Sequence, residues 1–151
     1  MTARPIRRNA QTPDRNGKIF YTSTTSLSHI SKTTGSIIDC VPDILNTHKF
    51  LMDTFVELTG LEKRSLASKY LHFHCPDKFF IYDSRAKTAI GKIVKRPDRE
   101  ILSGLEDYDA EYGDFVCRML ELQEYLDEKM GIYENPRSID SFLLSSLYVN
   151  D

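Results

Sequence analysis

The sequence predicts an all-α fold, a single compact domain of five or six helices with little or no strand. Apolar residues recur at helical spacing in several segments, and capping or breaking residues stand at the ends of these segments. With 151 residues the chain is long enough for one domain and too short for two ordinary ones. Hydrophobic residues make up 40% of the chain and aromatic residues 11%, which is enough for one core.

The N-terminal part has few apolar residues that could anchor a helix. Residues 1–18 mix Arg, Asn, Gln and Pro, so we expect a mobile basic tail there and a helical domain over 19–151, with order beginning near Ile19. A stretch rich in Ser and Thr then leads to Pro42. This proline favours a turn before a short helical start at Asp43.

A first long helix is predicted between Thr47 and Gly60. Thr47 has the side chain of an N-cap, and Gly60 can adopt the left-handed conformation that ends a helix. The apolar residues between them recur at helical spacing: Phe50, Leu51, Phe55 and Leu58. This pattern is typical of an amphipathic helix.

A helix-turn-helix unit is predicted over residues 62–93. Its first helix spans 62–74 and ends before Pro76, whose ring disfavours helical geometry in the preceding residue. We expect this helix to bury one stripe: Leu66, Tyr70 and Phe73. Asp83 or Ser84 can cap the second helix, which the sequence RPD breaks.

Two further helices complete the predicted domain. The first runs from about Asp109 to Met130 and is closed by Gly131. Its amphipathic stripe contains Tyr112, Phe115, Val116, Met119, Leu122 and Leu126. The second opens at Asn135 as N-cap, with Pro136 at the first helical position. The residues expected to point inward are Ile139, Phe142, Leu143 and Leu147.

Composition argues against several classes of protein. No run approaches the ~18 apolar residues of a membrane span, and the chain start lacks the apolar stretch of a secretory signal, so we expect a cytoplasmic protein with no membrane association. The three cysteines, Cys40, Cys75 and Cys117, are widely spaced, which favours free thiols over disulfides or a zinc cluster. The motifs of zinc proteases, nucleotide-binding loops and serine hydrolases do not occur.

The histidines do not predict a metal site, and no cofactor is expected. His72 and His74 lie close in the sequence and look like a ligand pair. On a helix, however, residues two apart point in directions about 200° different, so the two rings cannot chelate one ion.

Charge is distributed unevenly, although the net charge is only −2. A basic run follows Asp83 and contains Arg85, Lys87, Lys92, Lys95, Arg96 and Arg99, whereas residues 100–128 are strongly acidic. A basic face could follow phosphates. The same segregation also arises when two faces of one domain attract each other or a protein partner.

Lys69 and Asp83 are the strongest candidates for residues that take part in a reaction. An amine within reach of a carboxylate can act as a Schiff-base nucleophile with a proton-handling partner, yet such a pair can equally be an ion pair that joins two helices. Asp83 could also be a simple N-cap.

The segment SLASK, followed by an apolar helix, a proline turn and IYDSRA, resembles the helix-hairpin-helix base-excision DNA glycosylases. It is most similar to the 8-oxoguanine DNA glycosylase branch and its small bacterial relatives. On that alignment Ser65 and Ala67 stand at the two glycine positions, Lys69 at the nucleophilic lysine and Asp83 at the catalytic aspartate. The match covers about 25 residues, in which Arg85 stands where the family has histidine.

The resemblance implies a DNA-processing or nucleic-acid-binding protein, in repair or phage defence, with DNA as partner. Lys69 would attack the sugar carbon that carries a damaged base, and Asp83 would stabilise positive charge on the sugar or handle protons. The residues expected to contact nucleic acid are Ser65, Ser68, Arg85, Lys87, Lys92, Lys95 and Arg96. The alternative is a noncatalytic helical module that binds or regulates another protein through its charged faces.

Overall fold

The computed structural model describes residue 30 and residues 35–148, and this part of the chain is helical without any strand. It contains α2 (Ile37–Thr59), α3 (Arg64–His74), α4 (Ser84–Ile93), the 3-10 helix η1 (Glu100–Leu102), α5 (Ala110–Met130) and α6 (Pro136–Tyr148). The prediction of an all-α domain is confirmed. The predicted tail, 1–18, and the expected start of order near Ile19 lie outside the described residues.

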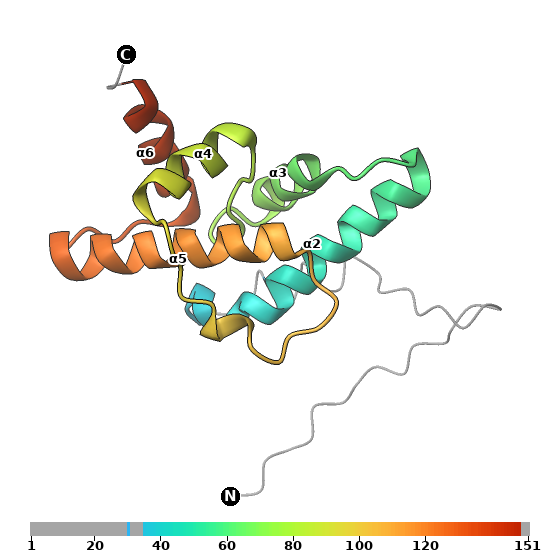
Figure 1. The fold of residues 1–151 in the computed structure, drawn as a ribbon, viewed down its shortest axis with the longest axis horizontal. Helices are drawn as coiled ribbons and strands as arrows, with labels where there is room; N and C mark the ends of the chain where they lie inside the picture. Colours follow the sequence, from blue (N-terminus) through green and yellow to red (C-terminus); the bar gives the residue numbers. More distant parts are fainter. Residues whose placement is uncertain (1–29, 31–34, 149–151) are drawn as a thin grey trace, which may run out of the picture.

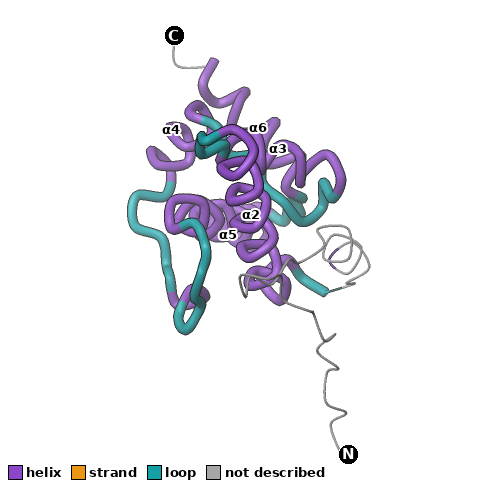
Figure 2. Tube along the Cα trace, turned by 90° about the vertical axis from the view of Figure 1, so that its right-hand side faces the viewer, coloured by secondary structure: helices purple, strands orange, loops and turns teal. Residues whose placement is uncertain are grey.

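Helix α5 runs through the middle of the molecule, and the other helices are arranged around it (Figure 1). α4 packs against both α5 and α6, while α2 packs against α3, η1 and α5. Figure 2 shows the same helices in the perpendicular view, with the long loop that contains η1 extending from the group. No helix among the described residues is long and apolar enough to cross a membrane.

The core lies where α2, α4, α5 and α6 meet the loop between α3 and α4. Ile44, Phe79, Phe80, Tyr112 and Ile139 are completely buried there. Burial of such side chains is the main favourable contribution to folding, at roughly 1.5–3 kcal/mol for each large apolar residue. The Tyr112 hydroxyl donates a hydrogen bond to the Phe80 carbonyl at 3.0 Å, so this polar group is not left without a partner in the core.

The helix ends follow the capping chemistry of the sequence. Gly60 and Gly131 adopt left-handed conformations, with φ of 71° and 63°, and end α2 and α5 as predicted. Asn135 accepts a hydrogen bond from the Ser138 amide at 2.9 Å and caps α6, and Asp83 accepts one from the Ala86 amide at 2.8 Å and caps α4. Asp109 caps α5 in the same way. The predicted free thiols are also confirmed, because all three cysteines are buried and unpaired.

The beginning of α2 differs from the prediction. The helix starts at Ile37, so Thr47 is a buried residue in its middle and not an N-cap, and no turn separates Pro42 from Asp43. Pro42 lies on the exposed side of the helix. The carbonyl of Ile38, which has no amide partner at position 42, therefore faces the solvent side, where water can bond to it at little cost.

The buried face of α3 also differs from the prediction. Leu66, Tyr70 and Phe73 are 50%, 45% and 80% exposed, so the expected buried stripe is on the surface. The helix instead turns four other residues toward the core: Ala67, Ser68, Leu71 and His72. Small side chains on this face let α3 approach the α3–α4 loop closely, and the loop supplies partners for the two polar groups. In α6, Phe142 is 44% exposed, Ile139 and Leu143 are buried as expected, and the side chain of Leu147 lies outside the described part.

Candidate nucleic-acid interface

Lys69 and Asp83 lie on neighbouring elements but are not paired. Lys69 is half-buried on α3, and the Asp83 carboxylate is used as the N-cap of α4. Among the ion pairs and hydrogen bonds of residues 35–148, none joins the two side chains. The structure therefore shows the capping role of Asp83, and it does not show the ion pair between helices.

A third residue, Asp140 on α6, connects these two groups electrostatically. Burial raises the pKa of Asp140, the negative charge of Asp83 raises this pKa further, and electrostatic interactions with His72 and Lys69 lower it. The carboxyl of Asp140 therefore lies within the field of Lys69 and Asp83. Sequence reasoning missed Asp140, because nothing local marks it: it only joins the group when α6 packs against α4.

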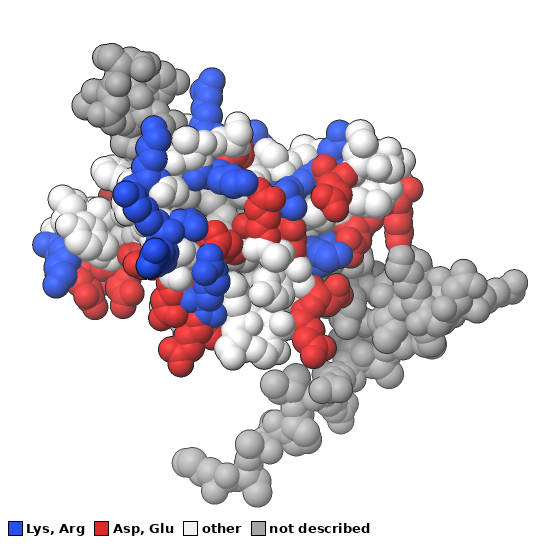
Figure 3. Space-filling view, viewed as in Figure 1, with Lys and Arg blue, Asp and Glu red and all other residues white. Residues whose placement is uncertain are grey.

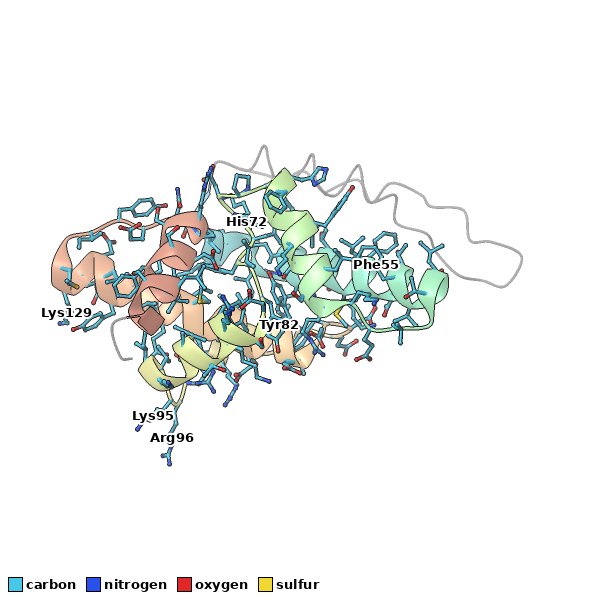
Figure 4. All side chains as sticks on the ribbon, turned by 90° about the horizontal axis from the view of Figure 1, so that it is seen from above. Phe55, His72, Tyr82, Lys95, Arg96 and Lys129 are labelled. Carbon is cyan, nitrogen blue, oxygen red and sulfur yellow. The ribbon has the colours of Figure 1, made fainter. Side chains whose placement is uncertain are left out.

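The two histidines of α3 have separate structural roles. His72 is buried, and its Nδ1 donates to the Phe79 carbonyl at 2.7 Å (Figure 4). His74 is exposed, and its Nδ1 lies 2.8 Å from the Tyr70 carbonyl. Within the described residues no group of histidine, cysteine or carboxylate side chains could hold a metal ion.

Ser68, which we expected to contact nucleic acid, lies inside the protein. Its side chain is fully buried, and its hydroxyl accepts a hydrogen bond from the Tyr82 amide at 2.9 Å. The hydroxyl oxygen also lies 2.9 Å from the Ser65 carbonyl. Ser68 thus fixes the loop before α4 and has no access to a phosphate. Ser65 is half-buried in the first turn of α3.

The predicted cations of α4 divide into two groups. Arg85, Lys92, Lys95 and Arg96 are exposed, and no ion pair of the described residues includes them. We call these four residues the α4 basic face. Lys95 and Arg96 extend outward from the end of α4 (Figure 4), and Lys and Arg side chains gather over this region in the space-filling view (Figure 3). Lys87 is different, because its amine lies 2.5 Å from Glu111.

The remaining charges meet at the N-terminus of α5. Arg64 forms a two-point contact with Asp109, with Nε to Oδ2 at 2.5 Å and Nη2 to Oδ1 at 2.9 Å, and its Nη1 lies 3.0 Å from Glu111. Glu111 also receives the amine of Lys87 and the hydroxyl of Tyr82. We call this group the α5 cap network: Arg64, Tyr82, Lys87, Asp109 and Glu111. It joins α3, α4, α5 and the α3–α4 loop.

The α5 cap network changes the protonation behaviour of its acids. Burial alone would raise the pKa of Asp109, but the hydrogen bond and charge of Arg64 outweigh this effect and lower the pKa. The hydrogen bond from Lys87, with that from Tyr82, lowers the pKa of Glu111. Carboxylates at a helix N-terminus are further favoured by the helix dipole. Both acids are therefore held ionised as structural anions.

His48 lies directly beneath this network. Its ring stacks on Tyr112 with 3.7 Å between centroids, and its Nε2 is 3.3 Å from the Arg64 carbonyl. The ring is completely buried, and its Nδ1 has no hydrogen-bond partner in the described structure. Burial lowers the pKa of His48 to about 4, so this ring is neutral at pH 7.

The acidic run also pairs with cations further along α5. Arg99 binds Asp114, with its Nε 2.8 Å from Oδ1, and the Nε of Arg118 lies 2.8 Å from Oδ2 of the same residue. The basic and acidic runs of the sequence thus partly neutralise each other inside one domain. Of the basic run after Asp83, the α4 basic face is the part that has no ion pair within residues 35–148.

Comparison of the chain with protein-family models, with curated proteins and with solved structures finds no match.

Proposed function

We propose that this domain binds nucleic acid through the α4 basic face. The observation that carries the proposal is that Arg85, Lys92, Lys95 and Arg96 are exposed without an acidic partner in the described residues, while the neighbouring acids Glu111 and Asp114 are each paired with two cations. Phosphates are the ligands that such unpaired cations attract, through charge and the release of counterions.

Helix α4, which carries Arg85 and Lys92 and ends just before Lys95 and Arg96, is held firmly. Its opposite side is buried through Ala86, Ala89 and Ile90, and Asp83 caps its first turn. Arg85 and Lys92 are two turns apart, roughly 11 Å along the axis. That distance allows them to contact different phosphates of one strand.

Matched double variants test the proposal. Lys95→Ala with Arg96→Ala removes two cations of the α4 basic face, and Lys129→Ala with Arg137→Ala removes two exposed cations from α5 and α6. Binding of labelled oligonucleotides is measured by fluorescence anisotropy over a series of salt concentrations. We expect only the first pair to weaken binding and to reduce the slope of log K against log salt by roughly two. Equal effects of the two pairs, or no binding by the wild type, contradict the proposal.

The lyase activity implied by the resemblance to glycosylases has Lys69 as nucleophile and Asp83 as its acidic partner. What supports it is the residue types and their position on neighbouring elements: Lys69 is half-buried on α3, and Asp83 stands at the start of α4. Borohydride trapping on DNA that carries an abasic site or 8-oxoguanine tests it. An adduct in the wild type that is lost in Lys69→Ala supports the activity; no adduct, or an equal adduct in the variant, excludes it. A role in repair or phage defence stays a prediction.

Binding of a protein partner is a second candidate function, favoured by the apolar stripe on the surface of α3. Leu66, Tyr70 and Phe73 are all exposed, which is unusual for three large apolar residues on one helix. The double variant Leu66→Ser with Phe73→Ser tests this function. A folded variant that loses a protein captured by the wild type supports it, and unchanged capture argues against it.

A further inference from the structure

Helix α4 presents to solvent a side that has cations and hydroxyl groups but no acid. From Ser84 to Pro97 the sequence contains no aspartate or glutamate. Lys87 is exposed but paired with Glu111. The other exposed polar side chains of the helix are two hydroxyl groups and two cations: Ser84, Thr88, Arg85 and Lys92. The solvent-facing side of α4 is therefore positive from its first turn to its last.

The position and size of α4 leave this side open to a large partner. The opposite side of the helix packs against α5 and α6. Figures 2 and 4 both show α4 at an edge of the helical group, and Lys95 and Arg96 extend outward beyond its end. Its ten residues form a rod about 15 Å long. The major groove of B-form DNA is about 12 Å wide and admits one α-helix, so α4 suits this groove.

The side chains of this region favour a duplex over a single strand. Proteins that bind single strands commonly stack the bases on exposed aromatic rings. Helix α4 contains no aromatic residue, and Tyr82 and Phe115 beside it are only 8% and 2% exposed. Cations and hydroxyl groups, in contrast, bind the phosphates and the base edges of a paired duplex.

We infer that α4 lies in the major groove of B-form DNA, with Thr88 toward the base pairs and the α4 basic face on phosphates at the edges of the groove. The inference rests on the proposed function and adds the kind of nucleic acid and the element that enters it. Arg85, Thr88 and Lys92 stand at positions i, i+3 and i+7, so they share one side of the helix. The major groove of an RNA duplex is too deep and narrow for side chains to read, so DNA is the expected partner.

The first test compares how the wild type binds four probes of equal length. They are a DNA duplex, the same duplex with glucosylated 5-hydroxymethylcytosine in place of cytosine, an RNA duplex and single-stranded DNA. The sugar on the modified cytosine fills the major groove and leaves the phosphates unchanged. We expect the unmodified DNA duplex to bind about tenfold more tightly than each other probe, because only this probe has an open B-form major groove. Fluorescence anisotropy at one salt concentration measures the four dissociation constants.

The second test adds bulk to the exposed side of α4 without changing its charge. Thr88→Tyr places a ring there, and Ser141→Tyr places one on the exposed side of α6. The two positions are matched, because each hydroxyl donates to the carbonyl four residues earlier. We expect Thr88→Tyr alone to weaken binding of the DNA duplex, by about tenfold, because the added ring keeps α4 from the floor of the groove. Thermal unfolding checks that both variants are folded.

Failure of this inference differs from failure of the proposed function. The position in the major groove is overturned if the modified duplex, the RNA duplex or the single strand binds as tightly as the unmodified DNA duplex. It is also overturned if the two tyrosine variants have equal affinities. Salt-dependent binding that is lost in Lys95→Ala with Arg96→Ala would still support the α4 basic face. If the wild type binds no probe, the inference and the proposed function both fail.

Discussion

The α5 cap network and the α4 basic face lie side by side and are built from the same kinds of residue, yet they differ in their partners. In the network, Arg64 and Lys87 each contact a carboxylate at the start of α5. On the basic face, Lys92 and Lys95 have no such partner among the described residues. The positive charge of a residue therefore indicates a binding role only where no neighbouring carboxylate pairs with it.

The two regions also differ in burial. The side chain of Asp109 is only 10% exposed and that of Arg64 21% exposed, so their attraction is poorly screened by water. The cations of the α4 basic face are exposed and hydrated. We therefore expect changes in the network to affect mainly stability, and changes on the basic face to affect mainly binding.

The largest expected effect on stability comes from lowering the pH. The neutral ring of His48 is buried beneath the network with a pKa of about 4, whereas an unfolded histidine has a pKa near 6.5. Between these values the unfolded state binds more protons, so the free energy of unfolding falls as the pH is lowered from 6.5 to 4, by about 3 kcal/mol in total. Chemical denaturation at several pH values measures this loss.

His48→Gln serves as the control for the pH effect. This variant is less stable at pH 7, but it has no group that titrates in this window at position 48. Its stability should therefore change much less between pH 6.5 and 4. An equal slope in the wild type and the variant would falsify the assignment to His48.

Arg64→Ala should have the next largest effect. It leaves the largely buried carboxylate of Asp109 beside the buried ring of His48 and without its cation, at an expected cost of about 2–3 kcal/mol in the free energy of unfolding. Arg64→Lys keeps the charge but lacks the two-point geometry, so it should lose only part of this stability. Urea denaturation at pH 7 measures the stability of both variants. If Arg64→Ala lowers the free energy of unfolding no more than substitution of a surface residue does, the network does not stabilise the fold.

Asp83 gives a smaller effect that separates its two roles. Asp83→Ala removes the N-cap of α4 and should cost about 1 kcal/mol, whereas Asp83→Asn keeps a capping oxygen and should be nearly as stable as the wild type. If Asp83 also acts in a lyase reaction, Asp83→Asn stays folded but loses the trapped adduct. Thermal unfolding and borohydride trapping on the same samples measure the two roles, and equal stability of all three proteins would contradict the cap.

The smallest effect on stability is expected on the α4 basic face. Lys95→Ala with Arg96→Ala breaks no described ion pair, so the free energy of unfolding should change by about 0.5 kcal/mol or less. A large loss in urea denaturation would show that these cations support the fold, and the contrast between the two regions would disappear.

Much of the fold follows from chemistry that is local in the sequence. Gly60, Gly131 and Asn135 mark helix ends correctly, because the conformations and hydrogen bonds they provide depend only on a few neighbouring residues. The start of α2 and the buried face of α3 are not local. They depend on packing: Thr47 has become a core residue, and the α3 face with Ala67 lies inward although the stripe with Leu66 is more apolar.

The candidate site is predictable to a similar extent. The basic run after Asp83 is visible in the sequence. The sequence does not show that Lys87 is paired and Lys92 is not, because this difference depends on where Glu111 lies in space. Ser68 shows the same limit, since its burial follows from contact with Tyr82 in the loop after α3. Sequence spacing identifies the charges, and the arrangement of α4 against α5 decides which of them are left unpaired.

Helix α2 has a consequence for how the domain opens. Met52 is its last buried residue, and the side chains of Val56 and Leu58 beyond it are 38% and 76% exposed. Amide protons near Ile44 are therefore protected until the whole domain unfolds, while those of the last two turns exchange with solvent through local fraying. Two parts of one continuous helix thus open with different free energies. Amide hydrogen exchange should show the opening free energy falling near Met52.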